Sequence, residues 1–178
     1  IIAGGVGSFE PRKLSNEDAE KFEDKYLFYA VRDKEKFKNK NISIFGGGDS
    51  ALDWALELSK FSNISLIHRR DEFRGAPHTL AEIRKLENEG KISIKTPCQL
   101  DSIEGEKKID SIIVKFDNGK KEKIKTDIIL SFFGLIMKLG PIANWGLKMN
   151  KKTIDVNSKN FETNKKGIFA VGDICSYP

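Results

Sequence analysis

The chain has 178 residues, of which 39% are hydrophobic and 32% are charged, and its formal net charge is +5. These values are typical of one folded domain, or of one domain with parts of another, and they exclude a disordered chain. No apolar run approaches the roughly 20 residues of a membrane span, and no leader resembles a secretion signal. We therefore expect no membrane partner and a cytoplasmic location. Because the lysines are spread along the chain, we also expect no nucleic-acid partner.

The two ends of the chain are glycine-rich. It begins with IIAGGVGSF and stops with GIFAVGDICSYP, and each stretch joins a short apolar strand to glycines. Such turns are typical of places where the backbone approaches a ligand or a neighbouring segment. We therefore expect a fragment whose missing flanks complete a second domain.

The chain contains two cysteines, Cys98 and Cys175. They lie far apart in the sequence, and neither belongs to a C-x-x-C pair. We expect two reduced thiols without metal or dithiol chemistry.

The middle of the chain predicts alternating strands and helices. A β-branched run at residues 41–45 precedes three glycines, and apolar residues recur at helical spacing from Ala51 onward. A strand at residues 64–67, a helix at residues 76–90 and a strand at residues 92–94 follow. This order is a βαβαβ unit, which forms a parallel sheet with right-handed crossovers.

The pattern changes after the third of these strands. Alternating residues between 100 and 124 predict an antiparallel meander with a tight turn at residues 117–119. The apolar run at residues 127–134 predicts a further strand buried in the sheet. The expected fold is therefore α/β, a Rossmann-like domain of three layers with a parallel sheet and an antiparallel meander.

The glycines after the first of these strands form a G-x-G-x-x-A pattern. Gly46 permits the tight turn, Gly48 lets the backbone approach a pyrophosphate, and the small Ala51 allows close packing of helix on strand. The amides near Asp49 and Ser50 then face the phosphates at the positive end of the helix dipole. The alternative interpretation is a tight turn with a purely structural role.

A basic cluster follows the second strand, about 20 residues beyond the turn. In a dinucleotide-binding fold this position selects the cofactor, since an acid binds the ribose 2′-hydroxyl of NAD and arginine accommodates the 2′-phosphate of NADP. His68, Arg69 and Arg70 stand there, and Arg74 follows. The arginines offer forked donors to a phosphate, and His68 adds a contact or stacks near the adenine. The alternative interpretation is a solvated basic loop.

The stretches GGGDSALDWALEL and ISLIHRRDEFR together resemble the NADP-binding half of thioredoxin-reductase-like flavoproteins, most closely the ferredoxin–NADP reductases of the thioredoxin-reductase type. IIAGG with FEPR is similar to the family's flavin-domain segment before the crossover, LGPIANWGL to its return, and GIFAVGDICSYP to its second flavin motif. The resemblance implies an NADP-binding domain at residues 25–133. Pieces of a split FAD-binding domain flank it, namely residues 1–24 with the crossover and a truncated second segment at residues 134–178.

The resemblance implies two residues of the flavin site. Asp173 would accept a hydrogen bond from the ribityl chain of FAD, and Phe9 would lie against the flavin. As alternatives, Asp173 is a cap at the end of a strand and Phe9 is an ordinary core residue.

One segment discriminates within the family. Thioredoxin reductases carry a redox C-x-x-C shortly before the first strand of the NADP domain, where this chain has residues 29–32, with the sequence YAVR. Without a cysteine there, a dithiol attack on a disulfide has no nucleophile. Thioredoxin is therefore not the expected substrate, and the ferredoxin reductases of the family lack the pair as well.

The resemblance implies an NADPH-dependent reductase that passes hydride from NADP(H) to FAD and electrons to ferredoxin or flavodoxin, as a homodimer when full length. The fragment itself is expected to bind NADP but not to turn over, because it lacks the first glycine-rich FAD turn. Two alternatives remain open. One is a disulfide reductase of this family that acts on a small thiol without its own C-x-x-C, and the other is a non-catalytic NADP-binding module.

Overall fold

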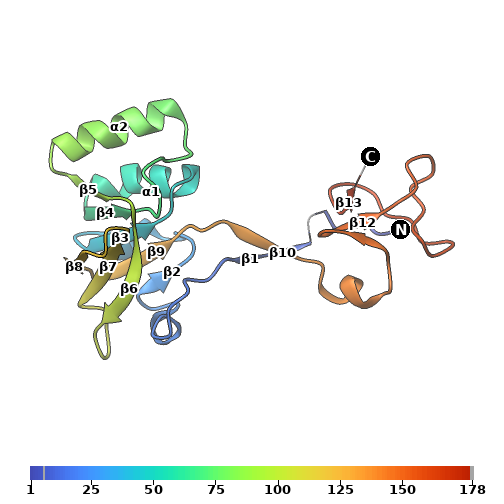
Figure 1. The fold of residues 1–178 in the computed structure, drawn as a ribbon, viewed down its shortest axis with the longest axis horizontal. Helices are drawn as coiled ribbons and strands as arrows, with labels where there is room; N and C mark the ends of the chain where they lie inside the picture. The colour runs from blue at the N-terminus through green and yellow to red at the C-terminus, as the bar shows by residue number, and fades with distance from the viewer. Residues whose placement is uncertain (6, 177–178) are drawn as a thin grey trace. The chain divides into compact units, whose positions relative to one another are not determined.

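The computed structural model describes residues 1–5 and 7–176, so Val6, Tyr177 and Pro178 of the expected flavin motifs lie outside the described residues. The chain forms two compact units (Figure 1). Unit 1 comprises residues 1–12 and 134–178, and unit 2 comprises residues 13–133. The predicted glycine-rich turn and the basic loop both belong to unit 2.

A five-stranded parallel sheet forms the centre of unit 2. Its strand order is β2-β9-β3-β4-β5. The strands are β2 (Leu27–Phe28), β3 (Asn41–Phe45), β4 (Asn63–Ile67), β5 (Ile92–Lys95) and β9 (Ile128–Ser131). The chain adds β4 on one side of β3 and later adds β9 on the other. The carboxyl end of β3 is therefore the topological switch point, where ligands bind in open α/β sheets.

Two α-helices cover one face of this sheet, α1 (Asp49–Ser59) and α2 (Pro77–Asn88). α2 begins with a proline, whose missing N–H would have no intrahelical acceptor at that position. It ends before Gly90, which has a positive φ of 72°. The side chains that α1 buries recur at helical spacing: Ala51, Leu52, Ala55 and Leu58.

An antiparallel meander covers the other face of the sheet, as Figure 1 shows. It consists of β6 (Cys98–Glu104), β7 (Ser111–Phe116) and β8 (Lys121–Lys125). A turn at residues 117–119 joins the last two strands, and the Gly119 amide donates to the Phe116 carbonyl at 2.9 Å. The predicted meander and its turn are confirmed.

The strands of the sheet distribute their side chains between two cores. Ile42 and Ile44 of β3 pack under the helices, whereas Phe45 packs against the meander. β9 repeats this alternation, with Ile129 on the meander side. Alternation of period two across a sheet covered on both faces gives three layers, so the predicted fold class is confirmed.

Unit 1 contains short strands around a small core. β1 (Ser8–Pro11) and β10 (Leu135–Lys138) form an antiparallel ribbon, and β11 (Met149–Asn150), β12 (Thr153–Asp155) and β13 (Cys175–Ser176) form a second small sheet. Ile2 forms a parallel bridge with Ala170, which joins the IIAGG stretch to the GIFAVGD stretch. The 3-10 helix η3 (Gly140–Asn144) follows the ribbon.

The structure differs from the sequence prediction at several boundaries. α1 begins at Asp49, two residues before the expected start, and β9 ends at Ser131. The contact boundary falls after Arg12, whereas the sequence places it after residue 24. Residues 13–24 contribute Leu14 and Phe22 to the core on the meander side of unit 2. This segment contains only one 3-10 turn, η1 (Glu20–Phe22), so it has no periodicity that would reveal its packing.

Within the described ranges, no helix is long and apolar enough to cross a membrane.

Candidate functional site

The candidate site lies at the carboxyl ends of β3 and β4. Gly46 leaves β3 with a φ of 153°, and its amide donates to the Ile67 carbonyl of β4 at 3.1 Å. A Cβ at Gly46 would lie 2.8 Å from both the Ala51 Cβ and the Phe132 carbonyl oxygen. Both Gly46 and a small residue at position 51 are therefore needed for the turn, as the sequence predicts.

Gly48 meets a different demand. It is the N-cap of α1, with φ −103° and ψ 179°, and a Cβ built there would meet no atom within 4 Å. The fold does not need glycine at this position for space. The open side of the turn is where the G-x-G-x-x-A pattern brings a pyrophosphate against the backbone.

The first turn of α1 contributes Asp49 and Ser50, both on the surface of unit 2. Amides in the first turn of a helix have no intrahelical acceptor and carry the positive end of the helix dipole. The Asp49 carboxylate accepts a hydrogen bond from the Ala76 amide at 3.0 Å, immediately before α2. The side chain of Asp49 thus holds the end of the basic loop, a role that the sequence analysis did not assign.

The basic loop is tied to the glycine turn through its backbone. The Arg74 amide donates to the Gly47 carbonyl at 2.6 Å, and Gly48 and Arg74 form a parallel bridge. At the other end of the loop, the His68 amide donates to the Lys95 carbonyl at 3.0 Å. Both ends of the loop are therefore fixed to the sheet and the turn.

The three arginines of the loop project from this fixed backbone. Arg69, Arg70 and Arg74 are exposed. In the part of the chain that the structure describes, none of them forms an ion pair, although acidic residues stand at positions 71 and 72. Three guanidinium groups without a carboxylate are available to an anionic ligand.

The imidazole of His68 lies against the glycine turn. A Cβ on Gly47 would come within 2.4 Å of the His68 ring. The ring also stacks on Phe73, with centroids 5.3 Å apart and an angle of 25° between the planes. Burial lowers the pKa of His68, and the charges of the neighbouring arginines lower it further, so the ring is neutral near pH 7.

Sequence reasoning missed two glycines of the site. Gly47 is the variable position of the G-x-G-x-x-A pattern, yet His68 fills the space of any side chain there. A Cβ on Gly75 would lie 2.1 Å from Leu52 Cδ1, so this glycine lets the loop pass close to α1. The uninterrupted GGG and the glycine that directly follows Arg74 were the available signals.

The segment that replaces the redox C-x-x-C contains no thiol. Its first residue, Tyr29, donates a hydrogen bond to the Glu23 carboxylate at 2.7 Å, and Lys13 pairs with the same carboxylate at 2.7 Å. Burial, with the bond to Glu23, raises the pKa of Tyr29 to about 12. Both cysteines are free and buried, as expected, and burial raises the pKa of the Cys98 thiol to about 11.

The two predicted flavin residues lie in unit 1. Phe9 is on β1, and 54% of its surface is exposed in this chain. Asp173 is exposed in the turn before β13.

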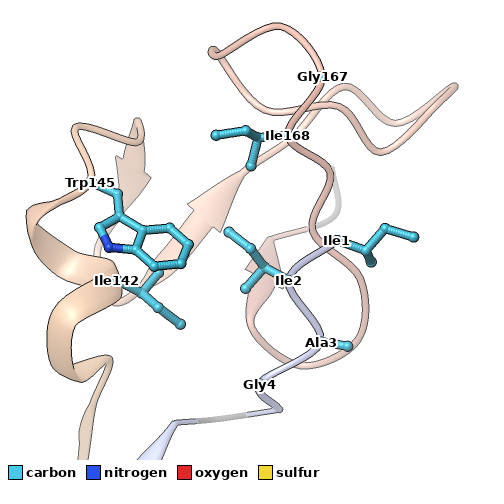
Figure 2. Close-up of a pocket in the computed structure, with 8 residues that line it drawn as sticks. All are labelled: Ile1, Ile2, Ala3, Gly4, Ile142, Trp145, Gly167 and Ile168. Atoms are coloured by element: carbon cyan, nitrogen blue, oxygen red, sulfur yellow. The ribbon is translucent and has the colours of Figure 1, made fainter.

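Unit 1 also contains an apolar cavity of about 450 Å³. Figure 2 shows Trp145 and Ile142 on one wall and Ile1, Ile2 and Ile168 across from them. Among the described residues, neither a charged side chain nor Phe9 or Asp173 lines this cavity. All of its lining residues belong to unit 1.

The fold and the glycine turn define a nucleotide-binding unit of the Rossmann type. The profile of the pyridine nucleotide-disulphide oxidoreductase family matches residues 1–178, and the chain belongs to this family. The ferredoxin–NADP reductase of Pelagibacter ubique is 60% identical over 178 residues, which are all of this chain and 53% of that protein. The ferredoxin–NADP reductase of Flavobacterium johnsoniae is 46% identical, over 99% of this chain and 51% of that protein.

Solved structures show the same relationship. Thioredoxin reductase from Lactococcus lactis, in its FR conformation, matches 99% of this chain and 57% of its own with a TM-score of 0.78 and 29% identity. Thioredoxin reductase from T. acidophilum matches 98% of this chain and 57% of its own with a TM-score of 0.80 and 25% identity. The resemblance to this family is confirmed. The chain spans about half the length of the curated relatives it matches.

Proposed function

We propose that this chain is the NADP-binding part of an NADPH-dependent flavoprotein reductase that delivers electrons to ferredoxin or flavodoxin. The observation that carries the proposal is the set of three exposed arginines, which have no carboxylate partner among residues 1–5 and 7–176, beside a glycine turn whose outer side is open. The family and the names of the relatives agree with it.

The turn fits a dinucleotide pyrophosphate. The space in front of Gly48 is open, and the amides at the start of α1, near Asp49 and Ser50, offer hydrogen bonds and a favourable dipole to the phosphates. Gly46 and Ala51 let the strand and the helix approach each other closely at this turn. These residues serve NAD and NADP equally, so the turn alone does not select the cofactor.

The selection comes from the basic loop. A 2′-phosphate on the adenosine ribose carries about two charges and several acceptor oxygens, which match the forked donors of arginine. Arg69, Arg70 and Arg74 supply such donors, and within the described part of the chain none of them is engaged in an ion pair. Two charge-assisted hydrogen bonds at about 1.5 kcal/mol each favour NADPH over NADH by roughly 100-fold.

The flavin part of the proposal depends on unit 1. Phe9 supplies an exposed aromatic ring for the flavin, and Asp173 supplies an exposed carboxylate for the ribityl chain. The chemistry that the two cofactors supply when bound is hydride transfer from NADPH to FAD, followed by electron transfer to the acceptor. The protein's own task is to bind and orient them, and no acid–base residue is assigned.

The absence of a dithiol favours ferredoxin or flavodoxin over a disulfide as the acceptor. Residues 29–32 contain no cysteine, and both Cys98 and Cys175 are buried with raised pKa values. The family resemblance further supports a homodimer when full length, a cytoplasmic location, and an NADP-binding domain at residues 25–133. The net charge of +5 suits an acidic protein partner.

The test compares cofactors and acceptors. Calorimetry of this chain should show NADPH binding that is roughly 100-fold tighter than NADH binding. The Arg69→Ala variant should lose about tenfold or more of the NADPH affinity while keeping its NADH affinity. Arg84→Ala is the matched control, because Arg84 pairs with Glu87 on α2 instead of facing the site.

The acceptor is tested with the full-length polypeptide that contains this chain. We expect NADPH-dependent reduction of ferredoxin or flavodoxin, and no reduction of low-molecular-weight disulfides. Equal affinity for NADH and NADPH would refute the cofactor assignment. If the full-length protein reduces a small disulfide and not ferredoxin, it is the disulfide reductase of the first alternative.

A further inference from the structure

The basic loop contains an aromatic contact that neither the turn nor the arginines require. The imidazole of His68 packs directly on Gly47 and stacks on Phe73. Arg69 and Arg70 lie between the two ring-bearing residues in the sequence, and Arg74 follows the second ring. The stack therefore spans the segment that carries the guanidinium groups.

His68 is the fixed end of this contact. Its amide donates to the Lys95 carbonyl, and its own carbonyl accepts from the Cys98 amide, both at 3.0 Å. The backbone of His68 is thus bound to β5 and to the start of β6. At the other end of the stack, the residue that follows Phe73 is held as well, since the Arg74 amide donates to the Gly47 carbonyl.

The arginine side chains cannot hold the loop in place themselves. They are exposed and, within the described ranges, make no ion pair that would restrain them. A long side chain that must be ordered on binding lowers the affinity, and a fixed backbone reduces that loss. The contact of His68 with Gly47 and Phe73 adds side-chain packing to the hydrogen bonds that fix the two ends of the loop.

We propose that His68 is a positioning residue for cofactor specificity. It clamps the loop between the glycine turn and Phe73, so that the loop arginines meet the 2′-phosphate, and it acts through them without touching the cofactor. The proposal rests on the proposed function and assigns a cause to its selectivity. It also explains why position 47, variable in the general pattern, is glycine here: any side chain would displace the ring.

The experiment measures the dissociation constants of NADPH and NADH by calorimetry for the wild-type chain and for His68→Ala, Phe73→Ala and their double variant. We expect each single variant to weaken NADPH binding by about tenfold and to leave NADH binding within about twofold. The double variant should be no worse than either single variant, because both remove the same contact.

Gly47→Ala provides an independent perturbation that leaves His68 in the sequence. The added methyl must push the ring away, so the same selective loss of NADPH affinity is expected. In the His68→Ala background the three atoms nearest to the methyl are gone, and Gly47→Ala should then have no further effect on NADPH affinity. Thermal unfolding of each ligand-free variant shows whether it is folded, and the ratio of the two affinities is compared among the folded variants.

The outcomes separate the two proposals. A wild-type chain that does not prefer NADPH refutes the proposed function. If the wild type prefers NADPH, equal losses of NADPH and NADH affinity in His68→Ala would mean that His68 touches the part that both cofactors share. Additive losses in the His68/Phe73 double variant, or unchanged selectivity in every variant, would likewise overturn the positioning role.

Discussion

Replacing Gly48 with alanine separates the demands of the fold from those of the ligand. In the free protein a Cβ at this position meets no atom within 4 Å, and the backbone angles, φ −103° and ψ 179°, suit alanine. Alanine restricts the backbone of the unfolded chain more than glycine does, and this stabilises the folded state of the variant by about 0.4–1 kcal/mol. Alanine is a poorer N-cap than glycine by a comparable amount. The free energy of unfolding should therefore stay within about 1 kcal/mol of the wild-type value.

The effect of Gly48→Ala on nucleotide binding should be large. The new methyl occupies the space through which the pyrophosphate reaches the amides of the turn. Loss of one charge-assisted hydrogen bond, at about 1.5–3 kcal/mol, lowers the affinity by about 10- to 100-fold. NADPH and NADH should lose affinity equally, because both carry the pyrophosphate. Calorimetry with each cofactor and urea unfolding of the ligand-free chain measure the two effects.

Gly46→Ala is the matched comparison, with the opposite pattern. Its Cβ would lie 2.8 Å from both the Ala51 Cβ and the Phe132 carbonyl, at a φ of 153°, so the strand and helix must move apart. We expect this variant to lose about 1–3 kcal/mol of stability. If Gly48→Ala binds NADPH as the wild type does, the pyrophosphate does not lie on this turn and the reasoning is refuted.

Three further results are expected. The buried hydroxyls of Ser43 and Thr126 are hydrogen-bonded to each other at 2.8 Å. Thr126→Val leaves the Ser43 hydroxyl without this partner and should lower the free energy of unfolding, measured in urea, by about 1–3 kcal/mol. The Ser43→Ala/Thr126→Val double variant should recover most of this loss. Among the described residues, the buried Ser131 hydroxyl has no hydrogen-bond partner. Ser131→Ala should therefore leave the stability unchanged or raise it by about 1 kcal/mol. A clear loss of stability would show that the hydroxyl does have a partner. Folding raises the pKa of Cys98 from 9.0 to about 11, so the thiol of the unfolded chain ionises first as the pH rises. The contribution of Cys98 to stability should be complete below pH 9 and decline as the pH rises toward 11. Cys98→Ala should flatten this part of the pH profile of stability, and an unchanged profile would contradict the assignment.

Sequence patterns predicted those parts of the fold that depend on local periodicity. β3 matches its predicted range, and β4, β5 and both helices lie within two residues of theirs, because their apolar residues follow the period of their own element. β2 (Leu27–Phe28) was missed, since two residues cannot show a period. The packing of residues 13–24 on the rest of unit 2 depends on contacts distant in the sequence, such as the hydrogen bond from the Asn16 side chain to the Asp101 carbonyl at 3.4 Å, which no local pattern reveals.

The residues of the candidate site also fall into those that a local sequence pattern predicts and those that it does not. Gly46, Gly48 and Ala51 were predictable because a strand, a turn and a helix in sequence impose a fixed spacing. The roles of Gly47, Gly75 and the Asp49 carboxylate were not, because each depends on a residue about 20 or more positions away in the chain. Sequence identified the residues suited to a phosphate, whereas only the structure shows how the loop that carries them is held.

The hydrogen bonds that close the basic loop involve no basic side chain. The Arg74 amide donates to the Gly47 carbonyl, and the Ala76 amide donates to the Asp49 carboxylate. Among the described residues, the guanidinium groups at positions 69, 70 and 74 take part in neither bond and form no ion pair. On the proposed function, these three exposed positions could therefore be substituted to change the cofactor preference without removing a hydrogen bond that closes the loop. During evolution, the preference for one nicotinamide cofactor could then change to the other while every intermediate sequence still folds.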